Sequence, residues 1–135
     1  MEHEYKHKEI TEKVIKAFYA VYNALGYGFL EKVYVQALVI ELQNLGLEVA
    51  RNVAITVFYA GQAVGEYFAD LVVADRVIVE VKAARTFAPE HEAQLLNYLK
   101  ATPYEVGLLL NFGPKAEIKR MAYDNDRKGR PTWTK

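Results

Sequence analysis

The stretch AVGEYFADLVVADRVIVEVKAA, residues 63–84, decides the fold of this chain. Two runs that are apolar at nearly every position, 63–74 and 77–84, are separated by Asp75 and Arg76. Runs of this kind are typical of strands that are covered on both faces. We therefore predict two neighbouring strands inside a sheet that is packed by helices.

The flanking segments supply helices and further strands. Apolar residues at steps of three and four, and a proline suited to a first helical turn, predict three helices. We expect these helices at residues 7–25, 30–42 and 89–100. β-Branched, aromatic and short apolar runs predict further strands at 48–59, 104–112 and 116–123. The order helix, helix, three strands, helix, strand, strand indicates an α/β sandwich, a mixed sheet flanked by helices.

The composition is that of a folded chain of single-domain size without thiol chemistry. Its 135 residues are 52% hydrophobic and 25% charged, which excludes a disordered or low-complexity chain. The absence of cysteine excludes disulfides, thiolate zinc sites and cysteine nucleophiles. Neither a basic leader nor an apolar stretch of about 20 residues is present, so we expect a cytoplasmic protein without a membrane segment.

Charge is balanced overall but not along the chain. Seventeen basic residues match seventeen acidic ones, which argues against coating of nucleic acid by bulk charge. Residues 115–135 hold seven Lys or Arg against three acids, a balance of +4 that leaves −4 for residues 1–114. Such an end is either a solvated tail or a phosphate-binding surface. In the second role, the substrate contacts are assigned to Arg120, Arg127, Lys128 and Arg130.

Three charged residues interrupt the two apolar strands: Asp70, Glu80 and Lys82. Side chains two apart in a strand leave the same face, so Glu80 and Lys82 share a face. A hairpin whose paired positions sum to 150 sets Asp70 opposite Glu80, with Cβ atoms about 4.5–5.5 Å apart. That register requires an odd number of residues in the connection around Asp75, not a two-residue turn.

Two carboxylates this close repel each other unless a cation lies between them, and hard oxygen ligands suit Mg²⁺ or Mn²⁺. Lys82 is then placed to hold or activate a water that attacks phosphorus, while the metal polarises a phosphoryl oxygen. The alternative is an ordinary ion pair between Glu80 and Lys82, with Asp70 in water near a strand end. The short Glu-x-Lys pattern alone does not decide between the two.

Two of the expected helices carry side chains that can complete this cluster. Gln94 and Tyr98 are four apart on one helix face, where an amide can orient a water and a phenol can donate to phosphate. An ordinary polar and aromatic helix surface is the alternative. Glu31 and Tyr34 share a face of the second helix, Tyr34 as an expected substrate contact. Glu31 is either a metal ligand or an acid favoured by the helix N-terminus.

These residues stand in an order that resembles a known family. The motifs are Gly28-Phe-Leu-Glu31-Lys-Val-Tyr34, Asp70, Glu80-Val-Lys82, Gln94-Leu-Leu-Asn-Tyr98 and Gly107-Leu-Leu-Leu-Asn111-Phe112-Gly113. Their conjunction resembles the GxxExxY proteins of the PD-(D/E)XK nuclease superfamily, from the first helix to Gly113. The chain departs from the superfamily name at one position, where Ala69 precedes Asp70 in place of proline.

The resemblance implies a restriction-endonuclease-like sandwich forming one domain over residues 1–135, with 115–135 as a basic C-terminal strand and tail. It implies metal-dependent hydrolysis of phosphodiester bonds in nucleic acid, with DNA as the expected substrate. The implied roles are metal ligands for Asp70, Glu80 and Glu31, catalytic lysine for Lys82, and the Gln-x-x-x-Tyr motif of RecB-like and λ-exonuclease-like members for Gln94 and Tyr98.

Two other interpretations remain open at this point. In the first, the acidic pocket is vestigial and the basic end binds nucleic acid or a protein without turnover. In the second, the site is completed by a homodimer or by an associated helicase, which fits the small size of the chain.

Overall fold

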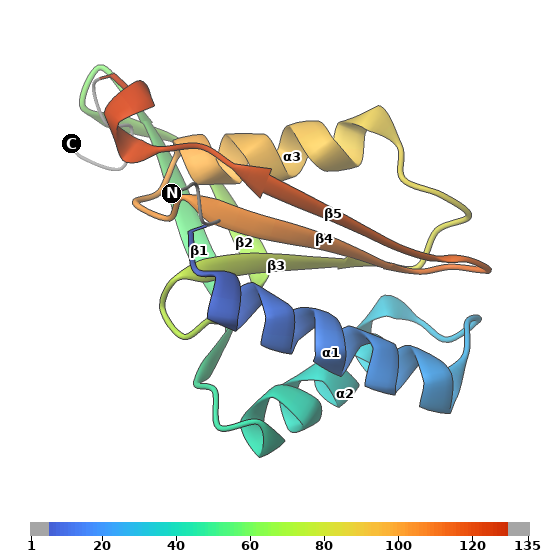
Figure 1. Ribbon diagram of the computed structural model, residues 1–135. Coiled ribbons are helices and arrows are strands. Elements are labelled where there is room, and N and C mark those ends of the chain that lie inside the picture. The colour runs from blue at the N-terminus through green and yellow to red at the C-terminus, as the bar shows by residue number, and fades with distance from the viewer. Residues whose placement is uncertain (1–5, 130–135) are drawn as a thin grey trace.

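The computed structural model describes residues 6–129, in which three helices and five strands form two helical layers around one sheet (Figure 1). The helices are α1 (Lys8–Leu25), α2 (Glu31–Asn44) and α3 (Pro89–Lys100), and the strands are β1 (Val49–Tyr59), β2 (Gln62–Val73), β3 (Val77–Lys82), β4 (Val106–Phe112) and β5 (Ala116–Ala122). A short 3-10 turn, η1 (Asn125–Arg127), follows β5. The predicted elements are confirmed to within a few residues at each end.

The sheet is mixed and its strands lie in the order β1-β2-β3-β4-β5. The β3–β4 pair is parallel, because α3 carries the chain back across one face, and the other three pairs are antiparallel. Helices α1 and α2 cover the opposite face (Figure 1). The predicted α/β sandwich with a central mixed sheet is therefore confirmed.

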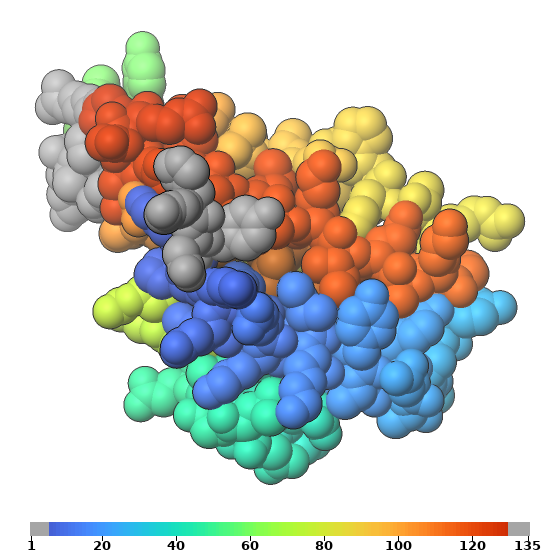
Figure 2. Space-filling model, viewed as in Figure 1, coloured from blue at the N-terminus to red at the C-terminus, as the bar shows by residue number. Residues whose placement is uncertain are grey.

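Strands β3 and β4 form the buried centre of the sheet, since every position from Val77 to Val81 and from Val106 to Phe112 is buried. Val79 and Val81 pack into the core under α1 and α2, whereas Ile78 packs into the core under α3. The alternation of a strand therefore directs Glu80 to the α3 face. In the space-filling view, side chains of α1 and β5 are in contact on the face of the sheet that α1 and α2 cover (Figure 2).

Local sequence explains where the helices start and stop. Gly26 follows α1 with φ +67°, a positive value that favours glycine, and its N–H donates to the Tyr22 carbonyl. Pro89 occupies the first turn of α3, and the preceding Ala88 N–H donates to Nδ1 of His91 at 3.0 Å. Among residues 6–129, none of the helices is long and apolar enough to cross a membrane.

The β2–β3 hairpin has the register that the charged residues predict. Leu71 pairs with Val79 and Val73 with Val77, so paired positions sum to 150. Three residues, 74–76, connect the strands, which confirms the odd-numbered connection. The first two of them have positive φ angles of 53° and 55°.

From Leu71 toward the turn between β1 and β2, the β1–β2 hairpin separates from β3 and curves over α3. The β2–β3 ladder ends at the Leu71–Val79 pair, while β2 stays paired with β1 up to the hairpin turn. Ile55 and Ala69 of the hairpin belong to the core under α3. Asn52, opposite this bend in β1, has a positive φ of 49°, although the β1–β2 register is the same on either side of it and shifts only between Val57 and Phe58.

Candidate active site

Asp70 and Glu80 lie where β2 and β3 separate, and their carboxylates take over the hydrogen bonds that the ladder no longer makes. The Asp70 N–H donates to Glu80 Oε2 at 2.7 Å, and the Val81 N–H donates to Asp70 Oδ2 at 2.8 Å. Each acid thus accepts a main-chain N–H of the neighbouring strand, and the two carboxyl groups are held side by side.

The surroundings of the pair favour its protonated form. Glu80 is only 3% exposed. Burial, and next the charge of Asp70, raise the pKa of Glu80 to about 8. Burial also raises the pKa of Asp70, against the lowering effects of the Val81 N–H and the Lys82 ammonium. A cation between the two carboxylates would remove this cost of ionisation.

Lys82 and two residues of α3 lie on the same side of the sheet. The Lys82 Nζ donates to Gln94 Oε1 at 3.2 Å. Tyr98, one helical turn further along α3, is 6% exposed. Burial raises the pKa of Tyr98 to about 12, and the charges of Glu80 and Asp70 add to the effect. The structure therefore brings together the five residues predicted to be catalytic.

Glu31 stands at the edge of this cluster. It is the first residue of α2, and its Oε2 accepts the Ala83 N–H, just after β3, at 3.4 Å. Its charge contributes to the raised pKa of both Asp70 and Glu80. Within residues 6–129, no three His, Asp or Glu side chains are grouped closely enough to hold a metal ion. Glu31 thus lies beside the acid pair, and its role as a metal ligand stays a prediction.

The chain also matches a known family over most of its length. The family model described as the PD-(D/E)XK nuclease superfamily matches residues 8–121. The chain belongs to the PD-(D/E)XK nuclease superfamily. The match includes every strand of the sheet almost to the end of β5.

A solved structure has a similar fold. The crystal structure of SSO0001 superposes with a TM-score of 0.54 at 18% sequence identity, over 88% of this chain. The likeness shows the fold, and this chain spans 58% of the length of that protein. No curated protein sequence matches the chain.

Tyr34, predicted as a substrate contact of this PD-(D/E)XK chain, is part of the core. It has no exposed surface, and its ring stacks on Phe112 at 4.2 Å with an 11° interplanar angle. The hydroxyl donates to the Gly26 carbonyl at 2.7 Å and accepts the Phe29 N–H at 3.2 Å. The expectation is corrected, because the ring and the hydroxyl of Tyr34 are both engaged within the protein and neither is free to contact a substrate. Tyr34 instead fixes the loop that leads into Glu31.

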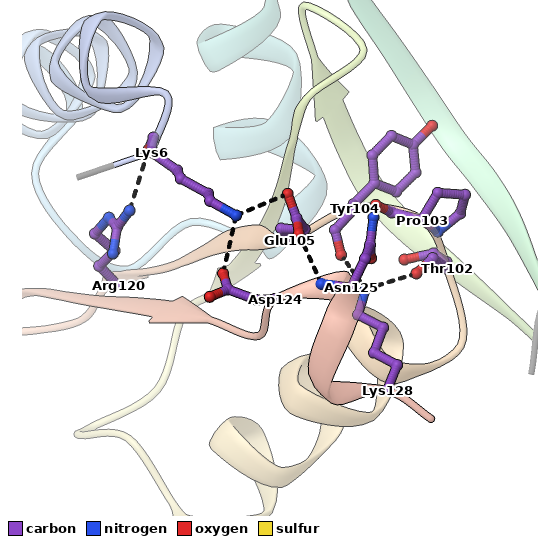
Figure 3. Close-up of polar contacts among 9 residues, drawn as sticks. All are labelled: Lys6, Thr102, Pro103, Tyr104, Glu105, Arg120, Asp124, Asn125 and Lys128. Atoms are coloured by element: carbon purple, nitrogen blue, oxygen red, sulfur yellow. Dashed lines mark hydrogen bonds and ion pairs between the residues drawn. The ribbon is translucent and has the colours of Figure 1, made fainter. Parts of the chain in front are cut away.

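Arg120 is separated from the acid pair by the sheet itself. It pairs on β5 with Leu108 of β4, whose side chain lies in the core under α1 and α2. Its guanidinium donates to the Lys6 carbonyl at 3.1 Å (Figure 3). Because Glu80 faces α3, Arg120 does not share a surface with it, and the prediction that it joins the same substrate site is corrected.

The other basic residues lie at the far end of the sheet. Along the paired strands, Ala122 of β5 is level with Val77 at the start of β3, whereas Glu117 is level with Lys82. The turn η1 follows Ala122, so its residues lie at the end of the sheet away from Lys82. The structure therefore does not bring Arg127 to the acid pair.

Lys128 and Arg127 are held by local contacts. The Lys128 Nζ donates to the Thr102 and Tyr104 carbonyls at 2.8 Å each (Figure 3). Burial lowers the pKa of Lys128. The Arg127 guanidinium lies over the Tyr123 ring at 4.7 Å. The Lys128 contacts anchor the segment after η1 to the α3–β4 loop, and Arg130 lies outside the described residues.

Acidic neighbours offset part of the positive charge at this end. Lys6 Nζ is 3.2 Å from a Glu105 oxygen and 3.1 Å from an Asp124 oxygen (Figure 3). The Glu105 carboxylate also accepts the Asn125 N–H at 2.7 Å. Lys6 therefore faces two acidic residues at this end of the sheet, only one of which belongs to residues 115–135.

Asn111 positions the chain after β3, a role that the sequence analysis did not assign to it. Its Oδ1 accepts the Ala84 N–H and its Nδ2 donates to the Ala84 carbonyl, both at 2.9 Å. A Cβ at Gly113 would collide with that same carbonyl oxygen. The two residues thus hold the chain just after Lys82. The signal was a polar side chain, fully buried here, inside an otherwise apolar strand.

Proposed function

We propose that this chain is a divalent-metal-dependent nuclease of the GxxExxY type that hydrolyses phosphodiester bonds of DNA. The observation that carries the proposal is the pairing of Asp70 and Glu80 at the split between β2 and β3, with Lys82 and Gln94 beside them. Superfamily membership supplies nucleic acid as the substrate class. DNA as the substrate, and the whole chain as one nuclease domain, are parts of the proposal.

Asp70 and Glu80 fit Mg²⁺ or Mn²⁺ as a pair of hard oxygen ligands whose ionisation needs a nearby cation. Such an ion, when bound, polarises a phosphoryl oxygen and stabilises the leaving oxygen. Glu31, at the edge of the pair, is proposed as the third carboxylate that would help to hold the metal.

The remaining residues act on the water and the phosphate. Gln94 fixes the Lys82 ammonium through the 3.2 Å hydrogen bond, so that the ammonium can hold the attacking water in a constant position. Tyr98, with a pKa of about 12, keeps its proton at neutral pH and can donate it in a hydrogen bond to a phosphate oxygen.

The test combines metal binding and cleavage on the same protein samples. Mg²⁺ and Mn²⁺ are titrated by calorimetry into the wild type, Glu80→Gln and Lys82→Ala, and each sample is then given single- and double-stranded DNA and RNA. Glu66→Gln is the matched control, because it makes the same chemical change at an exposed position of β2. Circular dichroism verifies that each variant is folded.

We expect Glu80→Gln to lose both the binding heat and cleavage, and Lys82→Ala to bind metal without cleaving. Glu66→Gln should behave as the wild type. Cleavage that survives in both site variants would overturn the assignment. DNA binding with neither metal heat nor turnover in the wild type would instead favour a non-catalytic binding module.

A further inference from the structure

A groove of about 590 Å³ lies between α3 and the curved β1–β2 hairpin. Val57 and Tyr67 line it from the hairpin, and Gln94, Asn97 and Tyr98 line it from the helix. Tyr67 is 50% exposed, and its ring centroid lies 6.0 Å from that of Tyr98 at an interplanar angle of 48°. The groove therefore presents an aromatic surface to solvent along one wall.

The groove lies next to the acid pair. Gln94 lines the groove and also accepts the hydrogen bond from Lys82. Tyr98 lines it too, and lies close enough to Glu80 and Asp70 for their charges to raise its pKa. A phosphate bound at the acid pair would thus place the neighbouring part of the same molecule at the mouth of the groove.

The lining suits a nucleobase better than a phosphate. Its two ionisable side chains of full charge, Glu90 and Lys100, have opposite signs, so the groove has no net positive charge to attract an anion. Its aromatic and small apolar surfaces match the flat face of a base, and base–aromatic stacking tolerates any base. The amides of Gln94 and Asn97 offer both donors and acceptors to a base edge.

A base can enter this groove only when it is unpaired. The groove has a helix on one side and a hairpin on the other, whereas a paired base is covered on both faces by its neighbours in the stack. We propose that the groove holds an unpaired nucleobase next to the scissile phosphate, so that the substrate is single-stranded at the cleavage point. This inference rests on the proposed function for the place of the phosphate.

Fluorescence of 2-aminopurine tests the groove separately from catalysis. Short single-stranded DNA oligonucleotides carrying this base at successive positions are titrated with full-length Glu80→Gln protein in EDTA, where metal-assisted cleavage is absent. The same titration is run with Tyr67→Ala and Tyr67→Phe in that background. Tyr59→Ala is the matched control, because Tyr59 is 76% exposed on the same hairpin and does not line the groove.

We expect 2-aminopurine to be quenched on binding, and Tyr67→Ala to weaken the affinity about tenfold, since one base–aromatic stack is lost. Tyr67→Phe keeps the ring and should restore the binding, and Tyr59→Ala should leave it unchanged. Equal affinities for Tyr67→Ala and Tyr67→Phe, equal binding of duplex and single strand, or no binding would each overturn the inference. The proposed function fails on a different result, the absence of metal-dependent cleavage by the wild type.

Discussion

Replacing Glu80 by Gln should stabilise the metal-free protein, and increasingly so as the pH rises. The carboxyl is buried and its pKa is raised from 4.5 to about 8. Between these two values the folded state holds a proton that the unfolded state has lost, so the free energy of unfolding falls as the pH rises. The amide of Gln has no such titration, and its oxygen can still accept the Asp70 N–H.

The size of the effect follows from the shift. At about 1.4 kcal/mol per pKa unit, the shift of the Glu80 pKa from 4.5 to about 8 lowers the free energy of unfolding of the wild type by about 5 kcal/mol above pH 8. The difference in free energy of unfolding between the variant and the wild type should therefore be about 1 kcal/mol larger at pH 5 than at pH 4, and about 3 kcal/mol larger at pH 7 than at pH 4. The raised pKa of Asp70 acts in the same direction in both proteins.

Urea unfolding in EDTA at a series of pH values measures this difference directly. Glu66→Gln, which removes an exposed carboxylate from the same hairpin, controls for the loss of one negative charge. Adding Mg²⁺ at pH 8 should stabilise the wild type and leave Glu80→Gln unchanged. A gap between wild type and variant that stays constant from pH 5 to pH 9 would refute the reasoning.

Three further substitutions test the contacts that position the site, each by urea unfolding. Asn111→Ala should cost about 3 kcal/mol, because both main-chain groups of Ala84 lose their partner, and a cost below 1 kcal/mol would contradict this role. Gly113→Ala should cost about 2 kcal/mol from the collision of its Cβ with the Ala84 carbonyl, and a neutral result would contradict it. Tyr34→Phe should cost about 1 kcal/mol and speed amide exchange in the loop after Gly26, while the aromatic stack keeps the helix packed; unchanged exchange would argue against the hydroxyl's role.

The hairpin geometry could be predicted because the charged residues constrain it. An odd connection is the only one that puts Asp70 and Glu80 on one face, whereas the apolar positions, buried on both faces of the strands, do not select a register. The turn residues then adopt left-handed conformations that no composition rule would have assigned to Ala74. Period and charge therefore sufficed for the fold and for the acids.

The role of Tyr34 and the fate of the basic end could not be predicted in the same way. Helical spacing shows that Tyr34 shares a face with Glu31, but not that its hydroxyl turns back to a loop eight residues earlier. Counting charges gives no information on which side of a sheet Arg120 lies. That side follows from the strand order and register, which bring together residues far apart in the chain.

The hydrogen bonds of Asp70 and Glu80 mean that the same two oxygens would serve both chemistry and architecture. A gene copy released from selection for cleavage would still be under selection at both positions for the ability to fold. Among substitutions at these positions, selection for folding would then retain Asn or Gln more often than Ala, since an amide oxygen still accepts the main-chain N–H. Relatives with amides at these positions would be inactive proteins that keep the same sheet. A sequence search that requires Asp and Glu at these positions would not find them.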